Sequence, residues 1–304
     1  MSLVVVGSVA YDAVQTPHGR TDRMLGGAAT YISLAANYFT PVKIVAVVGD
    51  DFAPEDRALL ADRDVDLAGL ETVPGKTFFW SGVYSADMNE RTTLVTDLNV
   101  FADFQPKLPP GYRNQPYLFL GNIQPGVQRQ VKAQMNGVRL TGGDTMNYWI
   151  NDYRQEVLET IAGWDLLLIN DSEARLLSGH NHMKRAAHEI LDMGPRIVVI
   201  KRGEYGAMLF LRDSFFVVPG YLLEQVFDPT GAGDSFAGGF MGYLASLGAT
   251  PGEDVGRQDL ARAVIYGSVL GSFCCEQFGV DRFRTLTRAE IDARFQEFKD
   301  FTNF

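Results

Sequence analysis

The chain has 304 residues, and its 27 Lys and Arg residues against 37 Asp and Glu residues give a formal net charge of −10. A nucleic-acid-binding protein needs a basic face to neutralise phosphates, so this acidic chain argues against nucleic acid as a partner. Hydrophobic residues make up 46% of the chain and charged residues 21%, which is typical of a globular protein with a sizeable core. We expect one domain spanning residues 1–304.

The cysteines and the N-terminal residues indicate a compartment. Cys274 and Cys275 are neighbours, and a disulfide between neighbouring residues is strained, so we expect buried free thiols in a reducing compartment. No stretch of 18 apolar residues occurs, and no basic region precedes the apolar segment that follows Met1. These observations predict a cytoplasmic protein without a membrane partner.

Short apolar segments alternate with segments of helical potential through the first two thirds of the chain. Continuous apolar strands separated by helices imply a mainly parallel sheet with helices on both faces. The sequence therefore predicts an α/β fold. The expected strands are residues 3–6, 43–48, 117–120, 138–140, 165–169 and 197–200, and the expected helices are residues 26–36, 127–135, 154–162 and 172–177.

Residues 76–100 break this alternation. Residues 77–86 and 91–95 are extended segments joined by the polar turn 87–90, a pattern that predicts a hairpin. Together with residues 11–15, the hairpin is expected to form a small antiparallel sheet that projects from the main body. Such a sheet is either a lid over a site or a plain extension, and the pattern alone favours neither.

The last third of the chain combines extended residues with longer helices. Residues 214–218 and 221–226 are rich in residues that favour strands. Helical spacing is found in residues 235–247, 259–273 and 287–298, and the last of these begins with a capping-box pattern. We expect these three segments to be packed helices.

A glycine-rich segment, DPTGAGDSFAGGF at residues 228–240, opens the first of these helices. The turn through Gly231, Ala232 and Gly233 is expected to leave backbone N–H groups unpaired beside the positive end of the helix dipole, which suits a phosphate. The segment is not a Walker A loop, because no Gly-Lys-Ser/Thr follows. It is not a Rossmann fingerprint either, because the G-x-G-x-x-G spacing is absent.

Asp234 adds a carboxylate at this anion site, where it would repel a bound phosphate. An acid is useful there if it holds and deprotonates a hydroxyl that attacks phosphorus, while the amides stabilise the transferred group. For an isolated aspartate, an ordinary helix N-cap is the alternative. The complete segment favours the catalytic interpretation.

The same segment resembles the C-terminal signature of the ribokinase-like, or PfkB, carbohydrate kinases, and the resemblance covers essentially the whole chain. It implies a ribokinase-like three-layer α/β fold whose β lid, formed by about residues 11–25 and 75–103, closes over the substrate and excludes water. Weaker family features occur in the expected order: the di-glycine Gly26-Gly27, the hairpin, the N-x-x-E motif at Asn170 and Glu173, and the glycine pair Gly203 and Gly206.

The resemblance also implies roles for site residues. Asp234 would be the catalytic base, and the amides of residues 231–233 would form the anion hole. On the acceptor side, Asp12 would hold substrate hydroxyls, and Gly26 and Gly27 would form a hinge in the substrate site.

On the nucleotide side, the turn with Gly203 and Gly206 would lie at ATP. Asn170 and Glu173 would act on Mg²⁺ and phosphate, largely through water. Taken alone, these two residues are a helix cap and a first-turn acid. Asp228 and Thr230 would lie beside the monovalent cation, such as K⁺, that many members of the family use.

Two places depart from the sugar kinases of the family. Tyr31 stands where those kinases usually carry an Asn that touches sugar hydroxyls, and its ring would either stack on a base or apolar face or narrow the pocket. Lys201 and Arg202 replace the usual Thr-Leu, and they would pair with nucleotide phosphates or an anionic substrate, or stay solvated. We assign Tyr31 to the substrate site and Lys201 to the nucleotide site.

These features predict a kinase that uses ATP and Mg²⁺ to phosphorylate a hydroxyl of a small sugar or sugar-like substrate. The alternative is a nucleoside (adenosine-like) kinase, favoured if Tyr31 stacks on a base. A non-catalytic ligand sensor of the same fold would have lost Asp234 or the glycine loop, and both are present. A homodimer through the lid is a further expectation, because Phe78, Phe79, Trp80 and Tyr84 would cover such an interface or else line the substrate site.

Overall fold

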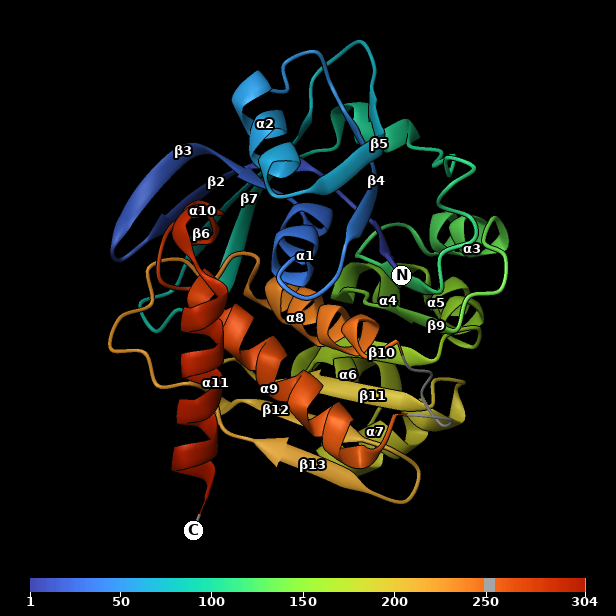
Figure 1. Cartoon of the computed structure of the whole chain (residues 1–304), viewed down its shortest axis with the longest axis vertical. Coiled ribbons are helices and arrows are strands. Elements are labelled where there is room, and N and C mark those ends of the chain that lie inside the picture. Colours follow the sequence, from blue (N-terminus) through green and yellow to red (C-terminus); the bar gives the residue numbers. More distant parts are fainter. Residues whose placement is uncertain (249–254, 304) are drawn as a thin grey trace.

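The structure, a computed structural model that describes residues 1–248 and 255–303, is built around a large β-sheet (Figure 1). Within those residues the large sheet has nine strands in the order β13-β12-β11-β10-β9-β8-β1-β4-β5. Neighbouring strands pair in parallel from β11 to β5. At the other edge, β12 pairs antiparallel with β11, and β13 pairs antiparallel with β12. Their bounds are β1 (Leu3–Val6), β4 (Val42–Val48), β5 (Val65–Thr72), β8 (Tyr117–Leu120), β9 (Leu140–Gly143), β10 (Leu166–Asn170), β11 (Ile197–Lys201), β12 (Ala207–Phe210) and β13 (Phe215–Val218).

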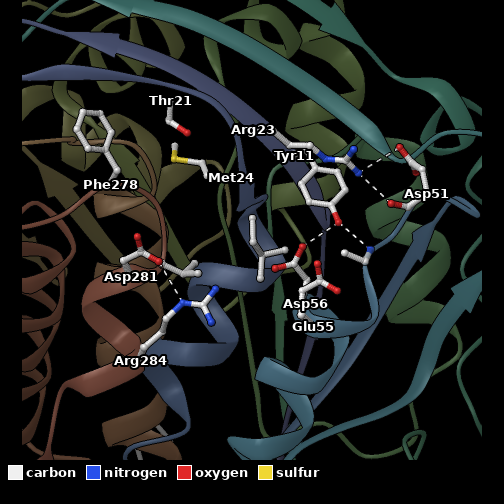
Figure 2. Close-up of a pocket in the computed structure, with 13 residues that line it drawn as sticks. Tyr11, Thr21, Arg23, Met24, Asp51, Glu55, Asp56, Phe278, Asp281 and Arg284 are labelled. Atoms are coloured by element: carbon white, nitrogen blue, oxygen red, sulfur yellow. Dashed lines mark hydrogen bonds and ion pairs between the residues drawn. The ribbon is translucent and has the colours of Figure 1, made fainter.

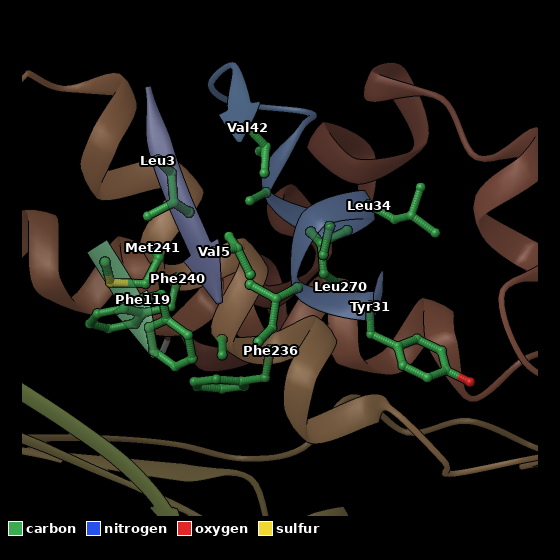
Figure 3. Packing of buried hydrophobic residues seen from close by; sticks show 14 of the residues in the cluster. Leu3, Val5, Tyr31, Leu34, Val42, Phe119, Phe236, Phe240, Met241 and Leu270 are labelled. Carbon is green, nitrogen blue, oxygen red and sulfur yellow. The ribbon is translucent and has the colours of Figure 1, made fainter. Parts of the chain in front are cut away.

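Each face of this sheet carries its own hydrophobic core, because successive residues of a strand face opposite sides. Leu3 and Val5 of β1 belong to one cluster of buried residues, and Val4 and Val6 belong to the other. Figure 3 shows part of the first core, where β1 lies beside the helix that carries Phe236 and Phe240. The first core is covered by α1 (Ala28–Ala36), α2 (Pro54–Asp62), α8 (Ala232–Ser246), α9 (Arg257–Cys274), α10 (Asp281–Thr285) and α11 (Arg288–Thr302), and the second by α3 (Pro125–Ala133), α4 (Asn147–Asp152), α5 (Arg154–Ile161), α6 (Asp171–Ser178) and α7 (Met183–Asp192).

This arrangement is the three-layer α/β fold that the sequence predicted. Each expected helix is present, with ends that shift by a few residues. The capping box at the start of α11 is confirmed, because Thr287 accepts a hydrogen bond from the Glu290 N–H and Glu290 accepts one from the Thr287 N–H.

Some strand predictions were wrong. Strand β9 begins at Leu140 rather than residue 138, because residues 136 and 139 still donate hydrogen bonds to the turn before β8. Residues 221–226 form no strand: β13 pairs with β12 alone, and Leu222 is 88% exposed after the chain leaves the sheet. Strands β5 and β12 were not expected, since charged residues interrupt the apolar pattern of β5 and β12 has only four residues.

A second, smaller sheet has the order β3-β2-β6-β7, with β2 (Ala10–Thr16), β3 (Gly19–Gly26), β6 (Phe78–Tyr84) and β7 (Arg91–Asp97). The predicted hairpin is confirmed as the antiparallel pair of β6 and β7. The prediction of a wholly antiparallel sheet was wrong, because β2 and β6 pair in parallel. Strand β3 was not predicted as a strand because its exposed residues are polar. In Figure 1 this second sheet lies at the left of the large sheet.

The start of the hairpin is held by the loop that follows β4. The Asp51 carboxylate accepts hydrogen bonds from the N–H and the hydroxyl of Thr77, both at 2.7 Å. The Asp50 carboxylate accepts one from the N–H of Gly75 at 3.2 Å. These bonds join the second sheet to the large one, and the 3-10 helix η1 (Asn99–Asp103) follows the hairpin.

Cys274 and Cys275 are both free thiols. Cys274 is buried as expected, but Cys275 is only half-buried. Among residues 1–248 and 255–303, no helix combines the length and the apolar character needed to cross a membrane.

Candidate active site

Chemistry-bearing residues meet at one edge of the large sheet, where the parallel strands β9, β10 and β11 end. Parallel strands present their carboxyl ends at the same edge, which is where ligands bind in open α/β sheets. Asp144 follows β9, Asn170 ends β10 and Lys201 ends β11. The first turn of α8, with Asp234, reaches the same place, because Lys201 Nζ donates a hydrogen bond to the Gly233 carbonyl at 3.4 Å.

The turn before α8 has the geometry of an anion-binding loop. Gly231 is the N-cap, with a left-handed φ of 77°, and no side chain caps the helix. Within the described residues, the N–H groups of Gly231, Gly233 and Asp234 have no hydrogen-bond acceptor. The prediction was wrong for Ala232, because the tight turn brings its N–H to the Pro229 carbonyl at 3.1 Å.

Tyr31 lies directly against this loop. A Cβ added to Gly231 would lie 2.5 Å from atoms of the Tyr31 ring, so only glycine fits above the ring. Tyr31 is 1% exposed, and Figure 3 shows its hydroxyl pointing away from Phe236 and Leu270. The ring is therefore packed into the protein, which favours the narrowed pocket over stacking on a ligand.

Asp234 is partly exposed in the first turn of α8. Desolvation raises the pKa of its carboxyl above the usual value, and the charges of Lys201 and Arg91 offset part of that rise. A carboxylate that must accept a proton has to be ionised first, so these two cations favour the form that a base needs.

Asp12 lies on β2, in contact with the di-glycine. The Asp12 carboxylate lies so close to Gly26 that a Cβ there would overlap it, and Gly27 is the N-cap of α1 with a φ of 93°. Asp12 is 5% exposed, and burial together with the carboxylates of Asp228 and Asp234 raises its pKa to about 8. The two glycines thus allow a buried acid to approach the backbone where the second sheet meets the large one.

Asp228 is fully buried beneath the loop, and both of its carboxylate oxygens are in use. One accepts from the Thr230 N–H at 2.9 Å and the other from the Gly279 N–H at 3.1 Å. The Thr230 carbonyl accepts a hydrogen bond from the Cys274 thiol at 3.3 Å, and its hydroxyl donates to the Tyr84 hydroxyl at 3.1 Å. These contacts hold the anion loop from below and from the second sheet.

Asn170 and Glu173 form a capping box at the start of α6. Asn170 Oδ1 accepts hydrogen bonds from the Glu173 N–H and the Ser172 hydroxyl, both at 2.8 Å. Glu173 Oε2 accepts from the Asn170 N–H at 2.8 Å, and burial of Glu173 raises its pKa against the lowering effect of Lys201. Asn170 therefore caps α6 and Glu173 is an acid in its first turn, the structural roles expected of these two residues taken alone.

The turn after β11 contains η2 (Gly203–Tyr205), and the second glycine pair stands at its first residue and directly after its end. Gly203 and Gly206 have positive φ values of 54° and 87°, and Gly206 packs against the Val218 carbonyl without room for a side chain. The tip of the hairpin reaches this turn, because Asn89 Nδ2 donates a hydrogen bond to Glu204 Oε1 at 3.1 Å. The second sheet thus contacts both the loop before α8, at Thr230, and the turn after β11, at Glu204.

Two residues of the site were not predicted from the sequence. Asp144 was missed because β9 was placed too early, although an acid directly after a buried strand is a recognisable signal. Arg91 gave no signal, because an arginine on an exposed strand is usually solvated. In the structure its guanidinium lies over the Trp80 ring. Its positive charge lowers the pKa values of Asp12, Glu173 and Asp234, whereas burial raises all three.

A cavity of about 500 Å³ lies at the base of the second sheet and is shown in Figure 2. The Tyr11 hydroxyl donates to Asp56 at 2.8 Å, while Arg23 lies over the Tyr11 ring and donates to the Asp51 carbonyl at 2.9 Å. These polar groups satisfy one another and fasten β2 and β3 to the start of α2. The residues that line this cavity include none of the predicted site residues.

Comparison with known proteins agrees with this geometry. The family model described as "pfkB family carbohydrate kinase" matches residues 1–285. The chain is similar to cytidine kinase from Thermococcus kodakarensis (31% identity over 86% of this chain and 95% of that protein). It is also similar to an ATP-dependent ribose-1-phosphate kinase from Halopiger xanaduensis (26% identity, 91% and 88%).

Solved structures have the same fold. A nucleoside kinase from Methanocaldococcus jannaschii, described as an archaeal member of the ribokinase family, superimposes with a TM-score of 0.76 over 97% of this chain and 98% of that one, at 19% identity. A nucleoside kinase from Burkholderia thailandensis in complex with inosine gives a TM-score of 0.76 over 97% and 96%, at 20% identity.

Proposed function

Because the chain belongs to the pfkB family of carbohydrate kinases, it is an ATP-dependent phosphotransferase with an alcohol group as acceptor, and we propose that Asp234 is the base of this reaction. The hydroxyl oxygen of a sugar or nucleoside attacks the γ-phosphorus, and its proton passes to the Asp234 carboxylate. The bond from the γ-phosphorus to the bridging oxygen breaks, and ADP leaves. One observation carries the proposal: the first turn of α8 brings a carboxylate and open amides to the same point.

The amides of Gly231 and Gly233 form the anion hole, and the ammonium of Lys201 adds a full positive charge beside it. The support is geometric: these two N–H groups lack acceptors within the described residues, and Lys201 Nζ already lies at the Gly233 carbonyl. Charge develops on the equatorial oxygens of the transferred group, and donors fixed in advance stabilise it without reorganisation. Lys201 therefore belongs to the phosphate side of the site.

Asp12 holds the acceptor, with Gly26 and Gly27 giving room for it. A buried carboxyl whose pKa is about 8 is protonated at neutral pH in the free enzyme, so it can donate as well as accept hydrogen bonds when a diol arrives. The Tyr31 ring is buried against Gly231, so it narrows this part of the pocket and does not stack on the acceptor.

Gly203 and Gly206 form the turn at the nucleotide, and Asn170 and Glu173 lie beside its phosphates with Mg²⁺. The residues present fit a hard cation, because the donors at this edge are carboxylates and an amide, and Asp144 Oδ1 is buried without a hydrogen-bond partner among the described residues. When bound, Mg²⁺ neutralises charge on the β- and γ-phosphate oxygens. The chain's own contribution is to orient the nucleotide and, through Lys201 and Arg91, to oppose the rise in the pKa of Asp234 that burial causes.

A monovalent cation such as K⁺ would lie at Asp228 and Thr230, which are buried beside the anion loop. The second sheet is a lid, supported by its contacts at Thr230 and Glu204, and it offers exposed apolar residues on β7 for a homodimer. The free thiols are consistent with the cytoplasm.

The acceptor is a ribose unit, either free or within a nucleoside. The relatives named for cytidine and for ribose-1-phosphate support this choice, and the fold neighbours include nucleoside kinases. Release of ADP, measured with a panel of free sugars and nucleosides, separates the two candidates. Turnover with ribose but with no nucleoside would remove the second.

Asp234→Asn tests the central assignment. We expect phosphate transfer to fall by at least a hundredfold, in line with the loss of a general base, while ATP binding measured by calorimetry stays within a few-fold of wild type. Asp259→Asn is the matched control, because Asp259 is also an acid in the first turn of a long helix but pairs with Arg262. Retained turnover in Asp234→Asn would refute the role of Asp234.

A further inference from the structure

One face of the second sheet is turned toward the candidate active site. On β2 the Asp12 carboxylate lies against Gly26, and on β6 the Tyr84 hydroxyl accepts a hydrogen bond from the Thr230 hydroxyl at 3.1 Å. Strands β2 and β6 pair in parallel without a break in register, and Asp12 lies opposite Trp80. Side chains alternate between the two faces of a sheet, and residues opposite one another share a face. Trp80 therefore lies on the same face as Asp12 and Tyr84.

The other aromatic residues at the start of β6 have packing partners in the body of the protein. Phe79 lies opposite Tyr11, and both belong to the first hydrophobic core on the other face of the sheet. Phe78 stacks on Phe101 of η1, with ring centroids 5.4 Å apart. Trp80, by contrast, is held by residues of its own sheet and is only half-buried.

The Trp80 ring lies across its own strand, over Gly82. A Cβ added to Gly82 would overlap the ring, so glycine is the residue that lets the ring lie there. Trp80 Nε1 donates a hydrogen bond to the Thr93 hydroxyl at 3.4 Å, and the Arg91 guanidinium lies 5.3 Å from the ring centroid. These three contacts fix the position of a large, partly exposed aromatic surface on the face that carries Asp12.

The spacing of the strands puts this surface beside the acceptor. Neighbouring strands are about 4.8 Å apart, and two residues span about 6.6 Å along a strand, so the ring over Gly82 is within reach of a group bonded to a ribose at Asp12. In a nucleoside that group is a flat base. Bases stack on aromatic side chains through their π-faces, and a nearby arginine can add a cation–π contribution.

We propose that the Trp80 indole is the stacking platform for the base of a nucleoside acceptor, with Gly82 setting the position of the ring. The proposal rests on the proposed function, because it takes the ribose of the acceptor to be held by Asp12. It narrows the acceptor from a ribose unit of either kind to a nucleoside. Every base has a π-face, so the platform separates nucleosides from free sugars without choosing among the bases.

The test measures acceptor binding by calorimetry, without nucleotide or metal. Cytidine, adenosine and methyl β-ribofuranoside, which has the ribose ring but no base, are titrated into wild type, Trp80→Leu and Trp80→Phe. We expect wild type to bind both nucleosides more tightly than the methyl riboside. Trp80→Leu should weaken nucleoside binding by about 5- to 150-fold and leave methyl riboside binding within twofold. Trp80→Phe keeps an aromatic face and should retain most of the nucleoside affinity.

Phe79→Leu is the matched control, because it also removes an aromatic ring from β6 but on the opposite face. Its nucleoside affinity should stay within twofold of wild type. Gly82→Ala supplies a second test, since the added methyl group displaces the Trp80 ring without removing it. It should weaken nucleoside binding in wild type but not in the Trp80→Leu background. A melting temperature for each variant shows that it is folded.

Unchanged nucleoside affinity in Trp80→Leu would overturn the proposal, as would a wild-type protein that binds neither nucleoside. Equal weakening of nucleosides and methyl riboside would also overturn it, because the ring would then act on the ribose or on the fold. A loss in Gly82→Ala that persists without Trp80 would refute the role of Gly82. If binding is as expected but no nucleoside is phosphorylated in the substrate panel, the proposed function fails while the stacking role of Trp80 stands.

Discussion

Replacing Asp12 by Asn should change how the stability of the free enzyme depends on pH. Asp12 is 5% exposed, and burial with the nearby Asp228 and Asp234 carboxyls raises its pKa from 3.8 to about 8. Between these two values the folded protein keeps a proton that the unfolded chain has lost. Rising pH therefore favours unfolding throughout this window, and stability is highest on its acid side.

The magnitude follows from one proton. Each pH unit inside the window costs about 1.4 kcal/mol of the free energy of unfolding, so the full shift corresponds to at most about 6 kcal/mol. Asp12→Asn has no proton to lose at this position. Between pH 5 and 7 its unfolding free energy should therefore fall less steeply than that of wild type, by up to about 1.4 kcal/mol per unit. The other buried carboxyls of the site keep some slope in both proteins.

Urea unfolding at pH 5, 6 and 7 measures these slopes, with nucleotide and metal left out. Asp22→Asn is the control, because Asp22 lies on the neighbouring strand β3 with an exposed side chain paired to Arg20. We expect wild type and the control to share one slope and Asp12→Asn to have a shallower one. Equal slopes in all three proteins would refute the claim that Asp12 holds a proton in the folded state.

Three other substitutions test the loop and the second sheet. Gly231→Ala should lower the free energy of unfolding by about 1–3 kcal/mol more than the control Gly179→Ala. Both glycines have a left-handed φ, but only Gly231 lies against Tyr31, and equal losses in urea unfolding would contradict this reasoning. Tyr31→Phe should be neutral or stabilising by up to about 1 kcal/mol, because it removes a buried hydroxyl that has no partner among the described residues, and a clear loss would reveal one. Arg91→Gln should reduce kcat/KM about tenfold or more with little change in melting temperature, because it removes a charge that lowers the pKa of Asp234; unchanged kinetics would leave Arg91 without a role.

Features that lie within one short segment were predictable from the sequence. The anion loop and Asp234 fall within four consecutive residues, and the turn conformation of Gly231 follows from the glycine itself. Lys201 was recognised because it departs from the family pattern, and the structure brings it to Gly233. The three-layer fold was predicted because the apolar strands are buried on both faces and carry no competing pattern.

Features that depend on tertiary placement were not predictable. Asp144 required the exact end of β9, and an error of three residues in that end hid it. The contact of Tyr31 with Gly231 joins segments 200 residues apart, which no local spacing encodes. Strand β3 follows the exposed edge of a small sheet, so its polar residues give no apolar alternation to detect.

The two contacts of the hairpin, one at Thr230 and one at Glu204, have a thermodynamic consequence. They tie the hairpin both to the loop that we propose for the phosphate and to the turn that we propose for the nucleotide. Any ligand that favours the docked hairpin also favours the other ligand, and by reciprocity each must raise the affinity for the other by the same factor. Binding of acceptor and nucleotide should therefore be cooperative.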